Sequence, residues 1–127
     1  MAKPEPIRTE DLPPTNPSYS QAVRAGEVIY AAGQIGFDPQ TGQLVSSEIV
    51  EQTRQALANL ATILKAAGSS LGAVVKTTVY MVNMSDWEAM NEVYMQYFRE
   101  NPPAKTTVEV SRLALGALIE IEAVAVI

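Results

Sequence analysis

The segment Ser47–Ala67 constrains the fold most, because its apolar residues recur at intervals of three and four along the whole stretch. This spacing predicts one long amphipathic helix, with Ser47 as its N-cap and Gly68 as its left-handed stop. The apolar stripe is typical of an ordinary core face and not of a cofactor site. A helix of this kind has to pack against another layer, so the remaining segments decide the fold.

The residues before this helix predict extended chain followed by a hairpin. Five of the eight prolines fall within residues 1–17, which we interpret as an extended lead-in. Ser20–Arg24 and Glu27–Ala32 carry strand-forming residues around Ala25-Gly26, as in a hairpin. The segment Phe37–Gly42 combines Asp-Pro with a terminal glycine and predicts a surface loop.

The residues after the helix predict a strand, a second helix and a second hairpin. Ala73–Val82 is rich in valine and threonine, which favours a strand. Ser85–Glu88 matches a capping box, and Asn101-Pro102-Pro103 would end the helix that begins there. Lys105–Leu113 and Ala117–Val126 alternate around a short turn, as in a hairpin. The buried stripe of the second helix is expected to contain Trp87, Met90, Tyr94, Tyr97 and Phe98.

This order of elements predicts a single α+β domain over residues 1–127, a mostly antiparallel sheet with both helices on one face. By alternation, the helix-covered face carries Val108, Val110, Ile119, Ile121, Ala123 and Ala125. The opposite face carries Lys105, Thr107, Glu109 and Ser111 on one strand, and Leu118, Glu120, Glu122, Val124 and Val126 on its neighbour. An uncovered face of mixed polarity needs a partner, so we expect a homo-oligomer with a cleft between subunits.

Composition excludes several function classes. The chain has no cysteine and no histidine, which removes disulfides, thiolate zinc sites, cysteine nucleophiles and the commonest general base, and no metal site is predicted. Nine Lys and Arg residues against fourteen Asp and Glu give a net charge of −5, which opposes nonspecific binding to nucleic acids or anionic membranes. The first residues contain no hydrophobic signal core, so we expect a cytoplasmic protein.

Three acidic residues could carry proton-transfer chemistry. Glu109, Glu120 and Glu122 are predicted to share a sheet face with Lys105, and neighbouring carboxylates raise one another's pKa. The alternative is a solvated sheet face. Lys105 could hold a substrate carboxylate, act as a nucleophilic amine, or be a surface lysine at the sheet edge.

Three further residues each allow a functional and a structural interpretation. Tyr19 follows a proline-containing loop, and its hydroxyl could donate into a pocket or its ring could simply pack. Asn91 lies in mid-helix, where asparagine either serves a ligand or faces water. Gly33 ends a strand and would permit close approach of a ligand, or a bulge.

Several ordered sequence blocks are more specific than any single residue. They are Tyr19–Val23, Gly33–Ile35, Asp38–Gly42, Gln52–Leu60, Val75–Val79, Asn91–Tyr94, Val108–Leu113 and Ile119–Ala123. With these blocks the chain resembles the RidA (YjgF) family from about residue 15 onward. The resemblance implies a chorismate-mutase-like α+β fold and a homotrimer with three ligand clefts between subunits.

The same resemblance implies a reaction. Active members hydrolyse 2-iminobutanoate and 2-iminopropanoate to 2-keto acids and ammonia without a cofactor. The glutamate that positions or activates water matches Glu120, the ring-side tyrosine matches Tyr19, and the helix asparagine matches Asn91. We therefore expect a small-molecule carboxylate as substrate, and neither nucleic acid nor membrane as partner.

The chain departs from the family pattern at three pocket positions. Lys105 replaces the arginine of Pro-Ala-Arg, Thr107 replaces a cysteine, and Ala32 replaces the serine before Gly33. Lysine keeps the charge but loses the planar fork of arginine. The leading hypothesis is an imine deaminase with Lys105 as carboxylate anchor, weak or redirected by this exchange. The alternatives are a non-catalytic trimer that binds small carboxylates, and an endoribonuclease or translation inhibitor, which the acidic, histidine-free chain disfavours.

Overall fold

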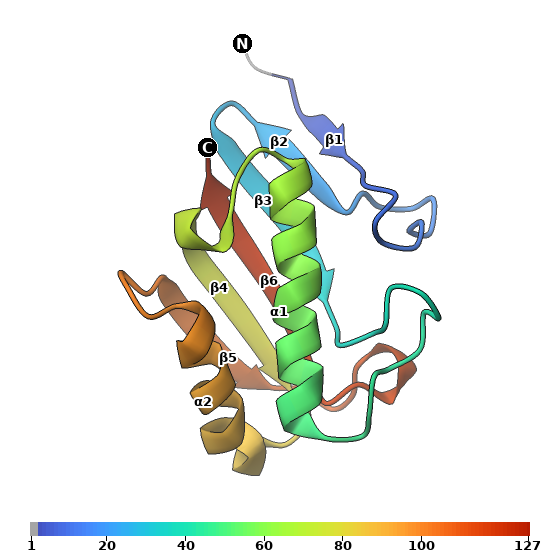
Figure 1. The fold of residues 1–127 in the computed structure, drawn as a ribbon, viewed down its shortest axis with the longest axis vertical. Coiled ribbons are helices and arrows are strands. Elements are labelled where there is room, and N and C mark those ends of the chain that lie inside the picture. The colour runs from blue at the N-terminus through green and yellow to red at the C-terminus, as the bar shows by residue number, and fades with distance from the viewer. Residues whose placement is uncertain (1–2) are drawn as a thin grey trace.

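The computed structural model describes residues 3–127 as one sheet whose helices both pack on the same face (Figure 1). The strands are β1 Glu5–Ile7, β2 Ala22–Ala25, β3 Val28–Gln34, β4 Val74–Met81, β5 Ala104–Glu109 and β6 Ile119–Val126. The helices are α1 Ile49–Ala66 and α2 Trp87–Tyr97, with short 3-10 turns at Leu71–Ala73, Met84–Asp86 and Ala114–Gly116. The predicted α+β architecture is confirmed. No helix within the described residues has the length and apolar content to cross a membrane.

The sheet has the strand order β1-β2-β3-β6-β4-β5. The predicted hairpin of β2 with β3 is confirmed, but the predicted hairpin of Lys105–Leu113 with Ala117–Val126 is wrong. β5 instead pairs in parallel with β4 at the sheet edge, and β6 lies between β3 and β4, antiparallel to both. Alternation and a turn-like segment indicate two strands, but they do not determine which strands pair.

The proline-rich lead-in contains a short strand that the sequence did not predict. Glu5–Ile7 pairs antiparallel with β2 and forms the other edge of the sheet. Proline is tolerated in such an edge strand because one side of the strand makes no ladder hydrogen bonds. Met1 and Ala2 of the predicted lead-in lie outside the described residues.

Helix α1 supplies most of the core on the covered face. Its residues Leu57, Leu60, Ile63 and Leu64 are fully buried against the sheet. The chain stops the helix at Gly68, whose φ of 81° confirms the predicted left-handed stop. The predicted cap is wrong. Glu48 occupies the N-cap position without a side-chain bond, and Ser46, not Ser47, accepts a hydrogen bond there, from the Glu48 amide.

Helix α2 begins at Trp87, directly after the 3-10 turn Met84–Asp86, and the side-chain cap belongs to that turn. Asn83 accepts hydrogen bonds from the backbone amide and the hydroxyl of Ser85, so the predicted capping box of Ser85 and Glu88 is wrong. Met90, Tyr94 and Phe98 are buried as expected, and Val93 joins them. Trp87 is 37% exposed, because its ring packs over the Lys105 side chain and not in the core.

The strand registers also correct the predicted sheet faces. Lys105 lies beside Thr77, which is buried under the helices, whereas Glu120 lies beside Tyr80, on the other face. Lys105, Thr107 and Glu109 therefore point to the helix side, and Glu120 and Glu122 point to the open side. By the same register Val108 faces the open side and is 37% exposed. The prediction failed because the relative phase of two strands that do not pair cannot be read from alternation.

Candidate active site

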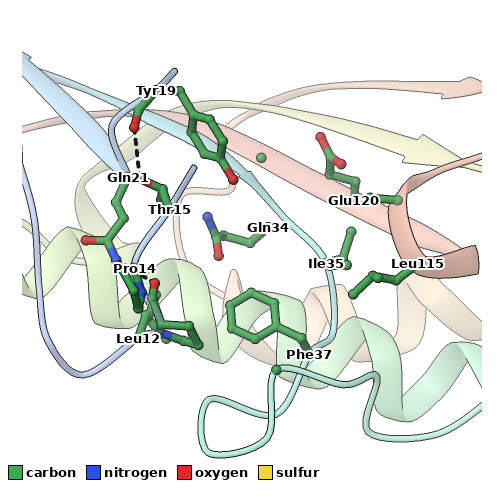
Figure 2. A pocket seen from close by; sticks show the side chains of 14 residues that line it. Leu12, Pro14, Thr15, Tyr19, Gln21, Gln34, Ile35, Phe37, Leu115 and Glu120 are labelled. Carbon is green, nitrogen blue, oxygen red and sulfur yellow. Dashed lines mark hydrogen bonds between the residues drawn. The ribbon is translucent and has the colours of Figure 1, made fainter. Parts of the chain in front are cut away.

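Three loops far apart in the sequence line a hollow of about 350 Å³ that is open to solvent at the start of β6 (Figure 2). They are the loop before β2, the loop after β3 and the 3-10 turn before β6. We call this hollow the Glu120 pocket. Its lining residues are Leu12, Pro13, Pro14, Thr15, Tyr19, Gln21, Gly33, Gln34, Ile35, Phe37, Gly42, Ala114, Leu115 and Glu120.

The carboxylate of Glu120 lies against the backbone of Gly33. A β-carbon at Gly33 would lie 2.7 Å from Cδ and 2.9 Å from Cγ of Glu120, and would overlap its Oε2. The register between β3 and β6 shifts between Ala31 and Gln34, so Gly33 lies in an irregular stretch of the ladder. Glycine is thus required because the carboxylate lies where a β-carbon would be, and not because of its φ, which lies outside the left-handed region.

Two features of its surroundings shift the pKa of Glu120. Burial raises the pKa of its carboxyl group above the ordinary value, and the negative charge of Glu122 raises it further. On the same face, Glu122 accepts a hydrogen bond from the Tyr80 hydroxyl at 2.9 Å. This bond, together with burial and the two glutamate charges, raises the pKa of Tyr80. A carboxyl group with a raised pKa is a better general base near neutral pH than an ordinary surface glutamate.

Tyr19 lies at the mouth of this pocket. Its ring is directed into the pocket on the same side as Glu120 (Figure 2), and the side chain is 52% exposed. The Thr15 hydroxyl donates a 2.8 Å hydrogen bond to the Tyr19 carbonyl and holds the loop in place. Of the two interpretations of Tyr19, the geometry favours a hydroxyl available to a ligand over a ring packed in the core.

Buried amide side chains fix the loops of this pocket. Asn59 on α1 donates to the carbonyls of Ile35 at 3.1 Å and Phe37 at 3.0 Å. Gln52 accepts a 2.8 Å bond from the Leu118 amide just before β6. Gln21 accepts a bond from the Thr9 amide at 2.6 Å. None of the three is predicted as a site residue from the sequence, although Gln52 and Asn59 lie beside the apolar stripe of α1, where a polar residue needs a hydrogen-bond partner.

Lys105 occupies a second hollow, of about 360 Å³, between α2 and the start of β5. We call it the lysine groove, and it is lined by Asn91, Tyr94, Met95, Phe98, Arg99, Pro102, Pro103 and Lys105. The Lys105 ammonium donates a 2.7 Å hydrogen bond to Asn91 Oδ1. It also lies 4.3 Å from the ring centre of Tyr94 and 5.3 Å from that of Trp87, within range of cation–π attraction. Burial lowers the pKa of Lys105.

The structure brings the predicted site residues together in two groups. Tyr19, Gly33 and Glu120 line the pocket, while Lys105 and Asn91 line the groove on the helix side. Within residues 3–127, the other two predicted residues, Ala32 and Thr107, do not line either hollow. Ala32 flanks Gly33 and donates its amide to the Gln21 carbonyl at 2.9 Å.

Glu109 does not join either group. Its carboxylate accepts a 2.8 Å hydrogen bond from the Met84 amide, at the turn that precedes α2. The predicted cluster of Glu109, Glu120, Glu122 and Lys105 is therefore wrong, since the open face holds only the two C-terminal glutamates of this set.

Comparison with known proteins identifies the family. The family model described as Endoribonuclease L-PSP matches residues 9–127. The chain belongs to the Endoribonuclease L-PSP family. This is the Rid family that the sequence blocks resemble, and the predicted membership is confirmed.

Individual members of the Endoribonuclease L-PSP family align with nearly the whole chain. A RutC family protein from Pyrococcus horikoshii is 53% identical over 121 residues, which cover 95% of this chain and 96% of that protein. The human protein named 2-iminobutanoate/2-iminopropanoate deaminase is 48% identical over 120 residues, 94% of this chain and 88% of its own length. The solved structure of Escherichia coli TdcF with bound serine has a TM-score of 0.91 at 36% identity and covers 97% of this chain and 98% of that one.

Proposed function

We propose that this protein is a hydrolytic deaminase of small 2-imino acids. In this reaction 2-iminobutanoate or 2-iminopropanoate and water give the 2-keto acid and ammonia. The observation that carries the proposal is Glu120, a carboxyl group with a raised pKa that lines a pocket beside Tyr19 and Gly33. The human relative that bears the name of this activity supports the same substrate class.

In this proposal Glu120 acts as the general base. It takes a proton from a water molecule as the water oxygen attacks C2 of the protonated imine, which gives a neutral carbinolamine. Glu120 then gives this proton to the nitrogen and takes the hydroxyl proton as the C–N bond breaks, so that the 2-keto acid and ammonia leave and the hydroxyl proton passes to solvent. The Tyr19 hydroxyl donates a hydrogen bond to the substrate at the pocket mouth. The seat of Glu120 against Gly33 keeps the carboxylate in one position, which lowers the entropic cost of the step.

Lys105 holds the substrate carboxylate in the same proposal, and it does so from a neighbouring copy of the chain. The support is geometric, because Lys105 and Glu120 point to opposite faces of the sheet within one chain. The open face also leaves Tyr30, Val108 and Val126 exposed, as expected for a surface that a second copy covers. We therefore propose a homotrimer with three sites, each completed by the lysine groove of an adjacent subunit.

The activity is tested by generating 2-iminobutanoate in situ with a threonine dehydratase and following the release of 2-keto acid. Glu120→Ala should lower the rate, and Lys105→Arg should raise it. One additional charge-assisted hydrogen bond corresponds to roughly tenfold or more in kcat/KM. Glu92→Ala and Lys65→Arg, at exposed helix positions, are the matched controls. A native chain and a Lys105→Arg variant that both match buffer would refute the deaminase.

The assembly is tested separately by light scattering coupled to size-exclusion chromatography. A trimer mass for the native chain supports a shared site. A stable monomer would contradict it, because Lys105 and Glu120 could then not meet the same substrate.

A second candidate is a trimer that binds small carboxylates without turnover. The solved relative with bound serine favours it, as does the lysine in place of the family arginine. Saturable binding of a 2-keto acid in calorimetry, without deaminase activity, would support this candidate. The endoribonuclease activity in the name of the family model is less compatible with a chain of net charge −5 that has no histidine.

A further inference from the structure

The open face of the sheet carries two glutamates on β6, and the proposed reaction uses only one of them. Glu120 and Glu122 are two residues apart on a regular strand, so both side chains point to the same face, with α-carbons about 7 Å apart. Among residues 3–127, Glu120 lines the Glu120 pocket and Glu122 does not. The surroundings of the two carboxyl groups therefore have to decide which one takes the proton.

Tyr80 on the neighbouring strand β4 contacts this pair of glutamates. The register between β4 and β6 places Tyr80 opposite Glu120 and Thr78 opposite Glu122. The Tyr80 hydroxyl nevertheless donates its 2.9 Å hydrogen bond to Oε1 of Glu122, which is its diagonal neighbour. Aromatic side chains reach diagonal neighbours across antiparallel strands. Tyr80 thus lies alongside Glu120 and is bonded to Glu122.

The bond from Tyr80 keeps a negative charge in place at Glu122. A hydrogen bond from a hydroxyl group to a carboxylate is stronger than one between neutral groups, and it favours the ionised acceptor. The same bond raises the pKa of Tyr80, as do burial and the charges of Glu122 and Glu120. The phenol therefore keeps its proton and remains a donor throughout the pH range in which glutamates titrate.

The charge of Glu122 acts in turn on Glu120. Burial raises the pKa of Glu120, and the negative charge of Glu122 raises it further. Two neighbouring carboxyl groups compete for one proton, and the group whose ionised form is less stabilised receives it. While Tyr80 stabilises the Glu122 carboxylate, the proton binds to Glu120, the glutamate of the two that lines the pocket.

Two other titratable side chains lie on the strands of the open face among residues 3–127. Lys76 on β4 donates a hydrogen bond from its ammonium group to the Thr106 hydroxyl. Tyr30 on β3 lies opposite Val124, two residues beyond the glutamates. Next to Glu120 itself, β3 presents the uncharged backbone of Gly33. Within the described chain, the charges that face the glutamates thus come from the glutamates themselves.

This arrangement belongs to a single subunit. Tyr80, Glu122 and Glu120 all lie on β4 and β6 of one chain, so neither the hydrogen bond nor the charge requires a residue from an adjacent copy. A second copy on the open face removes water from the pair, which strengthens the interaction between the two carboxyl groups.

We propose that Tyr80 is a positioning residue of the deaminase. Through its hydrogen bond it holds the Glu122 carboxylate beside Glu120, and this fixed negative charge makes Glu120 the carboxyl group that carries the proton during hydrolysis. The role in the reaction rests on the proposed deaminase function, whereas the arrangement of charges can be measured without turnover. Tyr80 does not contact the substrate in this proposal and acts only through Glu122.

The first measurement follows the ionisation of Glu120 by NMR in protein labelled with ¹³C at the glutamate carboxyl groups. The signal of Glu120 is the one that Glu120→Gln removes. Two unit charges about 7 Å apart in a water-like dielectric change an ionisation equilibrium by roughly threefold. At the pH where half of native Glu120 is ionised, about three quarters should therefore be ionised in Glu122→Gln. Tyr80→Phe should give an intermediate fraction, because Glu122 is then free to turn away.

The second measurement is the pH dependence of kcat/KM for 2-iminobutanoate, with each variant expressed as a fraction of its own plateau. The decline at low pH should move to lower pH in Tyr80→Phe and in Glu122→Gln, because Glu120 loses its proton more readily in both. A purely structural role of Tyr80 would lower activity by the same factor at every pH. Tyr30→Phe is the matched control, since it removes a phenol hydroxyl from the same face.

A titration of Glu120 that moves to lower pH in both variants, and not in Tyr30→Phe, supports the role of Tyr80. An unchanged titration in Tyr80→Phe would overturn it, even if Glu122→Gln has an effect, because Tyr80 would then not hold the charge. A shift in the NMR titrations without turnover of an imine by the native chain would support the arrangement of charges and refute the deaminase.

Discussion

The Glu120 pocket and the lysine groove are built in different ways. In the pocket, α1 and the loop before β2 hold irregular backbone through buried amide side chains, and Glu120 fits against a glycine. In the groove, Lys105 extends from a regular strand and is held by one hydrogen bond and two aromatic rings. Glu120 is thus fixed by backbone geometry, and Lys105 is fixed by side chains alone. Substitutions in the pocket should therefore have the larger effects.

The largest effect is expected for Glu120→Gln. The amide keeps the shape of the side chain but accepts no proton, so kcat/KM for 2-iminobutanoate should fall by about 100- to 10,000-fold. The measurement is steady-state kinetics with dehydratase-generated imine. If kcat/KM falls less in Glu120→Gln than in a variant of the lysine groove, the groove and not the pocket has the larger effect on activity.

Gly33→Ala is expected to have the second-largest effect, a loss of about 100-fold in kcat/KM. The new β-carbon would overlap the Glu120 carboxylate and displace it, and a shift of about 1 Å in a catalytic group has that order of effect. Gly72→Ala is the matched control, because its β-carbon would meet only the Ser70 hydroxyl, at 3.7 Å. Full activity in Gly33→Ala would show that the position of the carboxylate is not limiting.

Asn91→Ala tests the groove and should have a smaller effect. Loss of the bond to Lys105 would leave the ammonium held only by the rings, and we expect KM to rise about tenfold while kcat changes little. Gln96→Ala on the same helix is the control, since its side chain bonds only to Arg54 among the described residues. A fall in kcat at constant KM would mean that Asn91 acts in the chemical step and not through Lys105.

The smallest effect concerns stability and its dependence on pH. The folded-state pKa of Glu120 is raised, so its ionisation destabilises the fold as pH rises from below 4.5 through that raised value. Glu120→Gln should therefore raise Tm by a few degrees at pH 7, a gain that disappears below about pH 4. Calorimetry at one protein concentration checks this, with the exposed Glu92→Gln as control. A gain that is the same at both pH values would contradict the sign of the pKa shift.

The elements of the fold could be predicted from local patterns, whereas their pairing could not. The periodicity of α1, the hairpin of β2 with β3 and the strand β4 all follow from residues close together in sequence. The partner of β5 depends on where β6 inserts, and no residue of either strand encodes that choice locally. The same error placed Lys105 on the face of Glu120, although each strand had been recognised correctly.

In the candidate site, too, some residues could be predicted from the sequence and others only from the fold. Tyr19, Gly33, Asn91, Lys105 and Glu120 could be selected by chemistry and by the family blocks, and the structure groups them in two hollows. Leu12, Phe37 and Leu115 also line the pocket but cannot be predicted in this way, because an isolated apolar residue in a loop carries no signal of a pocket. Only the convergence of three loops gives these residues a common role.

The position of β6 has a consequence for how the protein is made. This strand is synthesised after every other strand, yet it occupies the interior of the sheet between β3 and β4. The emerging chain on the ribosome therefore holds two separated sheet fragments with unpaired edges until β6 is released. Unpaired edges favour association between chains, so the strand order makes a chain that lacks β6 more prone to aggregation than the complete sheet.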